Sequence, residues 1–271
     1  MEPIIQFDHV SKSFGEQVVL RELSLDIRPG EFLTIIGRSG CGKTTALRLV
    51  NGLLTPDKGL VLVQGQDVSE ADPVALRRRI GYAIQSVGLF PHVTVEKNVA
   101  YVPSISGMDG WKGKERREKV SALLERVGLD PALAGRYPRS LSGGQRQRVG
   151  IARALAAGPE LLLMDEPFGA VDGITRGQLQ EEIRKIHRES GITILFVTHD
   201  IAEALKLGTR VLVLDQGMVQ QCDAPEEILR HPATEFVARL VEQQRRTCFL
   251  PGEKLPDCAY GGVSCPQMAV V

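Results

Sequence analysis

A glycine-rich loop that directly follows an apolar segment is the feature that most restricts how this 271-residue chain can fold. Residues 31–37 read EFLTIIG, and residues 37–45 read GRSGCGKTT, which fits the pattern G-x-x-x-x-G-K-[ST]. An apolar run that ends in glycine is typical of a strand buried in a parallel sheet, and apolar residues at helical spacing follow from Lys43. The loop therefore predicts an α/β fold in which a buried strand leads through the loop into a helix.

The chemistry of this loop points to the phosphates of a nucleotide. Gly37, Gly40 and Gly42 let the backbone curl until consecutive N–H groups face one anion, and the N-terminus of the following helix adds its dipole. Lys43 places a positive charge on the same oxygens, and the hydroxyl of Thr44 is suited to Mg²⁺. We expect the nucleotide to contact Gly37, Arg38, Ser39, Gly40, Cys41, Gly42, Lys43, Thr44 and Thr45.

A second apolar strand pattern, LLLMDE at residues 161–166, ends in two acids. Acids often end strands, so this pattern gains its meaning from the phosphate loop elsewhere in the chain. Asp165, at the tip of the strand, is the expected ligand of Mg²⁺, either directly or through water. Glu166 points in a different direction because it is one residue further on, which makes it the candidate general base for the attacking water.

The sequence LSGGQ at residues 141–145 has the form of a helix start. Ser142 and Gln145 fit an S-x-x-Q capping box, with Leu141 placed as a hydrophobic staple. The pair Gly143–Gly144 needs another reason, because each glycine lowers helix propensity by about 1 kcal/mol. Close approach of an anion to the helix N-terminus would supply one. Taken alone, the motif is explained equally well by a plain capped helix.

Hydrophobic periodicity divides the rest of the chain into an α/β core and a helical insert. We expect strands at 4–10, 18–27, 31–37, 80–84, 161–164, 193–197 and 210–214. We expect helices from 43 onward and at 114–127, 143–157, 176–189 and 201–206, with two more within 225–243. The insert spans about 86–158. In residues 244–271 apolar periodicity is scarce, so we expect a poorly ordered tail.

Composition argues against several classes of protein. The formal net charge is zero, so no basic field favours nucleic acid, and basic clusters such as residues 77–79 are interpreted as solvated helix faces. No apolar run approaches the roughly 18 residues that span a bilayer, and residues 1–10 lack the layout of a signal peptide. Five scattered cysteines form neither a disulfide framework nor a close metal-ligand pair. We therefore expect a cytoplasmic protein that reaches a membrane only through a partner.

Four segments in fixed order carry a resemblance to a known family. GRSGCGKTT, LSGGQRQRVGIARAL, LLLMDEP and VTHD resemble the ATP-binding subunits of ABC transporters, and the resemblance covers about residues 4–243. It implies an α/β fold of the P-loop NTPase (RecA-like) type, with an antiparallel β subdomain and an inserted helical subdomain. It also implies ATP and Mg²⁺ as cofactors, and a head-to-tail dimer of two copies.

The resemblance assigns further residues to the site. In such a dimer the LSGGQ residues of one copy complete the γ-phosphate site of the other; these residues are Ser142, Gly143, Gly144 and Gln145. Gln85 matches the glutamine that senses Mg²⁺ and the γ-phosphate, and His199 in VTHD matches the switch histidine that acts with Glu166. A lone histidine at a strand end is more often structural, so His199 depends on the resemblance alone. Phe14 matches the aromatic residue that stacks on adenine, and Asp172 is retained in the dimer-contacting loop GAVD.

The resemblance also implies partners and a process. Such subunits dock on transmembrane permeases through the helical insert, where Leu89, Phe90 and Val93 are candidates, although core packing explains each of them equally well. A substrate-binding protein would act indirectly, and the subunit would lie on the cytoplasmic face of the plasma membrane. The sequences of several segments are most similar to those of the ATP-binding subunits of importers for osmoprotectants such as glycine betaine, choline or carnitine. Importers of polar amino acids and soluble ABC ATPases are the alternatives.

Overall fold

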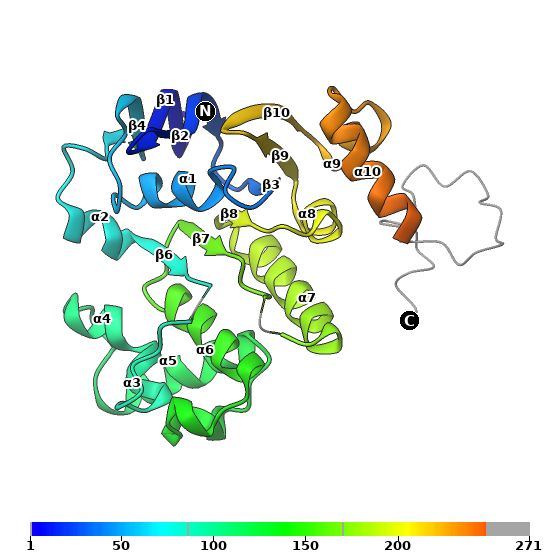
Figure 1. The fold of residues 1–271 in the computed structure, drawn as a ribbon. Coiled ribbons are helices and arrows are strands. Elements are labelled where there is room, and N and C mark those ends of the chain that lie inside the picture. The colour runs from blue at the N-terminus through cyan, green and yellow to red at the C-terminus, as the bar shows by residue number, and fades with distance from the viewer. Residues whose placement is uncertain (1, 86, 170, 248–271) are drawn as a thin grey trace. The chain divides into compact units, whose positions relative to one another are not determined.

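The computed structural model describes residues 2–85, 87–169 and 171–247 of the chain. It divides into two compact units (Figure 1). The first unit combines Met1–Asp67 with Phe196–Val271, and the second is the continuous segment Val68–Leu195. Each unit is described by itself.

An antiparallel sheet opens the first unit. Its strand order is β2-β1-β4-β5, built from β1 (Ile5–Phe14), β2 (Gln17–Ile27), β4 (Lys58–Val63) and β5 (Gln66–Asp67). Buried and exposed residues alternate along the second half of β2, where Leu23, Leu25 and Ile27 are buried. This alternation is what a sheet with one solvated face requires. In register, Ile5 lies opposite Ile27 of β2 and Val63 of β4.

The remaining strands of the first unit position the glycine-rich loop. Strand β3 (Phe32–Gly37) pairs in parallel with β9 (Arg210–Asp215), which pairs antiparallel with β10 (Met218–Asp223). Residues 32–36 are all buried, as expected of a strand covered on both faces. Helix α1 (Lys43–Val50) follows the loop, and α8 (Ile201–Leu207) packs on β3. The hydroxyl of Thr34 in β3 donates to the Ala204 carbonyl of α8 at 3.2 Å, so the one polar group in this buried strand is satisfied.

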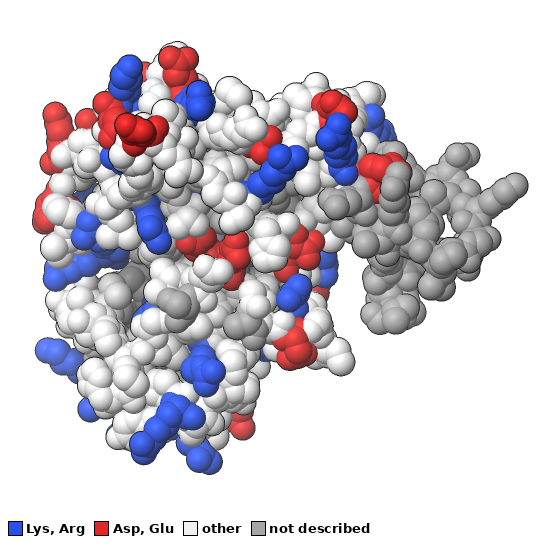
Figure 2. All heavy atoms as spheres, in the orientation of Figure 1, with Lys and Arg blue, Asp and Glu red and all other residues white. Residues whose placement is uncertain are grey.

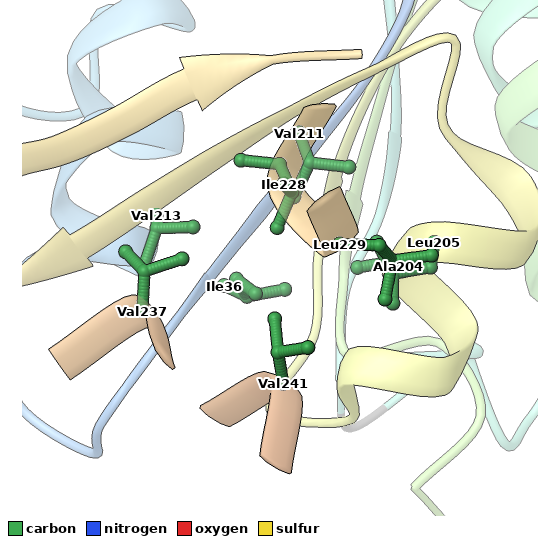
Figure 3. Close-up of a cluster of buried hydrophobic side chains, with 9 residues drawn as sticks. All are labelled: Ile36, Ala204, Leu205, Val211, Val213, Ile228, Leu229, Val237 and Val241. Carbon is green, nitrogen blue, oxygen red and sulfur yellow. The ribbon is translucent and has the colours of Figure 1, made fainter. Parts of the chain in front are cut away.

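Two C-terminal helices, α9 (Pro225–Arg230) and α10 (Glu235–Thr247), complete the core of the first unit (Figure 3). Val237 is fully buried and Val241 is 2% exposed, while Phe236 and Leu240 pack on the same cluster. These four side chains form the apolar face of α10 that packs on the core. The cluster consists of Ile36, Ala204, Leu205, Val211, Val213, Ile228, Leu229, Val237 and Val241.

The second unit combines parallel strands with most of the helices. Its strands follow the order β8-β7-β6, with β6 (Ile80–Ala83) parallel to β7 (Leu161–Asp165), and the division between the units falls within β8 (Thr193–Val197). All five residues of β7 are buried. The helices are α2 (Pro73–Arg79), α3 (Val95–Val99), α4 (Tyr101–Ile105), α5 (Gly113–Arg126), α6 (Gly143–Leu155) and α7 (Gly173–Ser190), with 3-10 turns at Pro131–Gly135 and Pro138–Ser140.

The predicted α/β class and the strands and helices named from periodicity are confirmed within the residues that the structure describes. Strands β4, β5 and β10 and helix α2 were not predicted, and within the expected helical insert α3, α4 and the two 3-10 turns were not predicted individually. Strand β10 reads MVQQCD, and its polar residues hide the apolar alternation of an edge strand. The bounds 4–243 and 86–158 stay predictions, and residues 248–271 of the expected tail lie outside the described residues.

The charged surface and the lengths of the helices can be compared with two classes that the composition argued against, nucleic-acid-binding and membrane-spanning proteins. On the face shown in Figure 2, lysine and arginine side chains are scattered and separated by uncharged or acidic atoms. Arg77, Arg78 and Arg79 are exposed on α2, as expected of a solvated helix face. Among the described residues, no helix is both long and apolar enough to cross a membrane.

Candidate nucleotide-binding and hydrolysis site

The loop between β3 and α1 is closed around the side chain of Lys43. Its ammonium group donates to the carbonyl of Gly37 at 2.8 Å and to that of Arg38 at 2.9 Å, and the residue is only 6% exposed. The amide of Cys41 donates to the Arg38 carbonyl at 3.2 Å, which tightens the curl. A buried cation in a curled loop at a helix N-terminus suits an anion, and the predicted phosphate contacts of this loop stay a prediction.

Glycine is required at two positions of this loop by space as well as by backbone angle. Gly37 has φ 155°, and a Cβ there would lie 2.0 Å from the Leu214 carbonyl oxygen. Gly42 has φ 106°, and a Cβ there would lie 2.6 Å from a methyl group of Leu20. Gly42 is also the N-cap of α1 and provides no side-chain cap. Gly42 therefore offers no side-chain acceptor to the first turn of α1, which suits a bound phosphate.

Cys41 lies inside the same loop, where it is 4% exposed. Burial raises the pKa of its thiol, and the charge of Lys43 offsets this only in part. A buried thiol with a raised pKa is a poor nucleophile. This agrees with a packing role for Cys41 in the loop.

The second unit brings together Asp165, Glu166 and Gln85. Asp165 ends β7 and is 6% exposed. Glu166 follows it with φ 44°, an uncommon conformation for a residue other than glycine that its surroundings must hold in place. The Gln85 side-chain amide donates to the Glu166 carboxylate at 3.2 Å. The end of β7 and the residue after it therefore carry two consecutive carboxylates, and Gln85 holds that of Glu166.

The LSGGQ segment forms the predicted capping box at the start of α6. The Ser142 amide donates to the Gln145 side-chain oxygen at 2.9 Å, and the Gln145 amide donates to the Ser142 hydroxyl oxygen at 3.2 Å. Gly144 has a reason inside the chain that the sequence did not reveal. A Cβ there would lie 3.2 Å from the Thr175 methyl group, so the glycine lets the start of α6 approach α7 closely.

The expected hydrophobic staple takes another form. Leu141 is buried, but the residue four positions into the helix is Arg146. Its guanidinium donates to the Leu141 carbonyl at 2.7 Å. A hydrogen bond between side chain and backbone therefore holds the entry of the chain into α6, where sequence reasoning expected apolar contact.

His199 lies in the first unit, in the exposed turn between β8 and α8. The backbone before it is fixed on β3, because the Thr198 amide donates to the Ile35 carbonyl at 3.1 Å. The Thr198 hydroxyl donates to the buried carboxylate of Glu203 at 2.6 Å. Sequence reasoning missed Glu203, although an acid three residues after the helix cap Asp200 is a recognisable signal.

Two other expected site residues lie at the ends of elements. Phe14 ends β1 and is 48% exposed, and the Lys12 ammonium lies 5.8 Å from its ring centre. Asp172 caps α7 by accepting from the Thr175 amide at 3.0 Å. Hydrogen bonds from the backbone and side chain of Thr175 hold the pKa of Asp172 below its ordinary value. An exposed ring and a fixed carboxylate suit stacking and interface contacts respectively.

Comparison with known proteins places this geometry in a family. A family model described as ABC transporter matches residues 20–169, which is more than half of the chain and includes the glycine-rich loop, the LSGGQ segment and the acids after β7. The chain belongs to the ABC transporter family. The structure of a dimeric ATP-binding cassette bound to ADP and Pi in a post-hydrolysis state is similar to this cassette, with a TM-score of 0.75 and 34% identity over 82% of this chain and 98% of that one.

Curated proteins similar in sequence to this ABC cassette are named as subunits of transport systems. The chain is 47% identical over 243 residues to the glycine betaine/carnitine/choline transport ATP-binding protein OpuCA of Bacillus subtilis, covering 89% of this chain and 63% of that one. It is 47% identical over 234 residues to the glycine betaine uptake system ATP-binding protein YehX of Escherichia coli, covering 86% and 75%. The chain thus spans less than two thirds of the length of the first curated relatives that it matches.

Proposed function

We propose that this chain is the ATP-hydrolysing subunit of an ABC importer for osmoprotectants such as glycine betaine, choline or carnitine. The observation that carries the ATPase part is the loop closed around Lys43, together with the carboxylate pair after β7. The substrate class is supported by the names of relatives at 47% identity. Import of a polar amino acid is the second candidate within the same family.

ATP is bound in this proposal by residues of the first unit. The exposed ring of Phe14 stacks on the adenine, which needs only a flat aromatic face. Backbone N–H groups of residues 37–45 and the start of α1 bind the phosphates. Lys43 shifts from the carbonyls of its own loop toward the β- and γ-phosphates, where its charge neutralises the charge that develops during transfer.

Residues of the second unit act on the attacking water. Glu166 accepts its proton as general base, and the Gln85 amide holds the Glu166 carboxylate in position beforehand. Mg²⁺, when bound, neutralises charge on the phosphates, and its proposed ligands are Thr44, Gln85 and Asp165, whose hydroxyl, amide and carboxylate oxygens suit that ion. His199 contacts the γ-phosphate and holds the catalytic geometry with Glu166.

A second copy of the chain completes the site in this proposal. Ser142, Gly143, Gly144 and Gln145 of one copy face the γ-phosphate bound by the other. Binding of two ATP molecules closes the dimer, and hydrolysis removes the phosphate that bridges the copies, so the dimer opens again. Such an alternation drives a permease by biasing it between two conformations.

An apolar groove in the second unit supports docking of a permease. Its cavity has a volume of about 390 Å³. Two of the docking candidates, Phe90 and Val93, line it, and the rings of Phe90 and Tyr101 lie 4.7 Å apart. Tyr101 and Ile105, which also line the groove, are 42% and 51% exposed. We propose that a short helix of the permease inserts its apolar side chains here, on the cytoplasmic face of the membrane.

Replacement of Glu166 by Gln tests the hydrolysis step. The change removes the base and keeps a hydrogen-bonding side chain, so kcat for ATP should fall at least about a hundredfold while nucleotide affinity is retained. The variant should also accumulate as an ATP-bound dimer in size-exclusion chromatography. Glu189→Gln, an exposed change at the end of α7, is the matched control. Hydrolysis at the wild-type rate by Glu166→Gln would refute the role of this base.

Co-purification and uptake test the transport part. From mild-detergent extracts the tagged chain should bring down an integral membrane protein, and Ile105→Asp should weaken that association. Val74→Asp, which changes an equally exposed side chain on α2, should not weaken it.

Reconstituted vesicles that contain the chain and its permease should accumulate labelled glycine betaine when ATP is supplied. Capture of no membrane protein favours a soluble ABC ATPase, and uptake of polar amino acids alone favours the second candidate.

A further inference from the structure

Arg153, in the last turn of α6, binds the backbone that follows Gln85. One guanidinium nitrogen donates to the Gly88 carbonyl at 2.7 Å and the other to the Val87 carbonyl at 2.8 Å. Arginine is suited to hold two adjacent carbonyls because its donors form a rigid planar fork. Arg153 is half-buried, and burial lowers the pKa of its guanidinium. Sequence reasoning gave Arg153 no role.

The segment that Arg153 holds has an unusual backbone. Val87 has φ 54° and Gly88 has φ 52°, and a β-branched residue such as valine rarely adopts a positive φ. A conformation of this kind persists only where its surroundings enforce it. The Val87 side chain also lies against the backbone of α6, since a Cβ on Gly150 would be 2.9 Å from a Val87 methyl group. Two features of α6, Arg153 and Gly150, therefore fix this segment.

The position of Gln85 follows from the position of this segment. Gln85 lies two residues before Val87 and donates to Glu166. We propose that Arg153 is a positioning residue, which couples the helix that begins at LSGGQ to Gln85 by holding the carbonyls of Val87 and Gly88. A movement of α6, whose N-terminus the proposed function assigns to the second copy, then displaces Gln85 relative to Glu166. This inference deepens the proposed function and rests on it.

The chain contains a matched control on the same helix. Arg148 donates from one nitrogen to the carbonyls of Val127 and Gly128, each at 3.0 Å, and Gly128 has φ 67°. It is thus a second clamp of α6 on two consecutive carbonyls, and its target is the end of α5. Arg148→Lys disturbs the packing of α6 in a similar way and leaves the segment after Gln85 untouched.

A double-mutant cycle distinguishes positioning from structure. Arg153→Lys keeps the positive charge but loses the planar pair of donors that holds the two carbonyls. The kcat for ATP hydrolysis should therefore fall about tenfold or more, because displacement of a catalytic group by about 1 Å can cost up to a hundredfold in rate. The nucleotide Kd should change little. In a Gln85→Ala background the same change should alter kcat by no more than about twofold. Arg148→Lys should lower the urea midpoint and act independently of Gln85. Gly150→Ala, which presses on Val87 while favouring the helix, should resemble Arg153→Lys.

Hydrogen exchange on the chain without nucleotide gives a readout that does not depend on activity. The Val87 amide, which donates to the Ile84 carbonyl at 3.1 Å, should exchange faster in Arg153→Lys than in wild type or Arg148→Lys. Equal exchange in all three, or independent effects of Arg153 and Gln85 on kcat, would overturn the inference. A wild-type chain that binds but does not hydrolyse ATP would refute the proposed function instead, and the exchange result would still stand.

Discussion

Helices α1 and α6 both begin at glycine-containing loops that are assigned to phosphate, yet their N-termini are built in opposite ways. α1 begins after Gly42, which has φ 106° and supplies no side-chain cap. α6 begins with a complete capping box, in which Ser142 and Gln145 satisfy each other's amides. The N-cap of α1 therefore provides no side-chain acceptor for the first turn, whereas α6 supplies partners for two of its donors from its own side chains.

This difference indicates how the two segments contribute. An N-terminus whose N-cap is a glycine, next to the buried Lys43, suits the phosphate binding within a single chain that we propose. A capped N-terminus is stable before any ligand arrives, so it can serve as a rigid surface presented to a second copy. We therefore expect changes at α1 to weaken nucleotide binding by the monomer, and changes at α6 to act on helix stability and on the dimer.

The largest effect is expected at Lys43. Replacement by Ala removes the only charge that the loop holds between the Gly37 and Arg38 carbonyls, so nucleotide affinity should fall at least about tenfold, because hydrogen bonds to charged groups contribute about 1.5–3 kcal/mol. Titration with a fluorescent ATP analogue measures this directly. Lys114→Ala, which breaks an exposed ion pair with Glu118 on α5, is the control and should leave affinity unchanged. Equal affinity in both variants would mean that the loop does not bind the phosphates.

Local signals in the sequence predicted the elements around this loop well. The apolar run before Gly37, the glycines of the loop and the helical spacing after Lys43 each indicate one structure, and all are local. The capping box at Ser142 was predicted for the same reason. Strand β10 was missed because its polar residues hide an edge strand, whose identity depends on its pairing with β9.

Contacts between segments distant in sequence were not predictable in this way. The approach of Gly144 to Thr175 and the clamp of Arg153 on Val87 and Gly88 both join residues through the tertiary fold. The motif LSGGQ alone does not reveal that Gly144 also allows α6 to pack closely against α7. The sequence thus indicates which residues carry chemistry, and the structure identifies those that hold them in place.

Alanine at two of the glycines sharpens the contrast between the loops. At Gly42 the backbone has φ 106° and a Cβ would lie 2.8 Å from the Val19 carbonyl oxygen, so Gly42→Ala should destabilise the fold by about 1–3 kcal/mol. At Gly144 the clash with Thr175 is milder, at 3.2 Å, and the gain in helix propensity of about 1 kcal/mol opposes it. Urea unfolding of the two variants measures the difference. A larger loss at Gly144 would show that the start of α6 is the more constrained loop.

Loss of the cap at Ser142 should have a smaller effect. Ser142→Ala removes the acceptor of the Gln145 amide, which typically costs about 1 kcal/mol of stability. Nucleotide affinity of the monomer should not change, because the capping box lies outside the loop around Lys43. Ser142→Thr, which keeps a hydroxyl acceptor, should restore most of the stability. Weaker nucleotide binding by monomeric Ser142→Ala would contradict the division of roles between α1 and α6.

The smallest effect, and one that depends on pH, is expected at Asp172, the cap of α7. Hydrogen bonds from Thr175 lower its pKa in the folded chain below the ordinary value of 3.8. A lowered pKa means that the ionised cap contributes stability above that ordinary value and loses it as pH falls through the folded pKa. The stability difference between wild type and Asp172→Asn should therefore be constant near neutral pH and shrink below about pH 4. Urea midpoints measured from pH 7 to pH 3 test this, with Asp109→Asn as an exposed control. A difference that grows as pH falls would mean that Asp172 stabilises α7 in its protonated form.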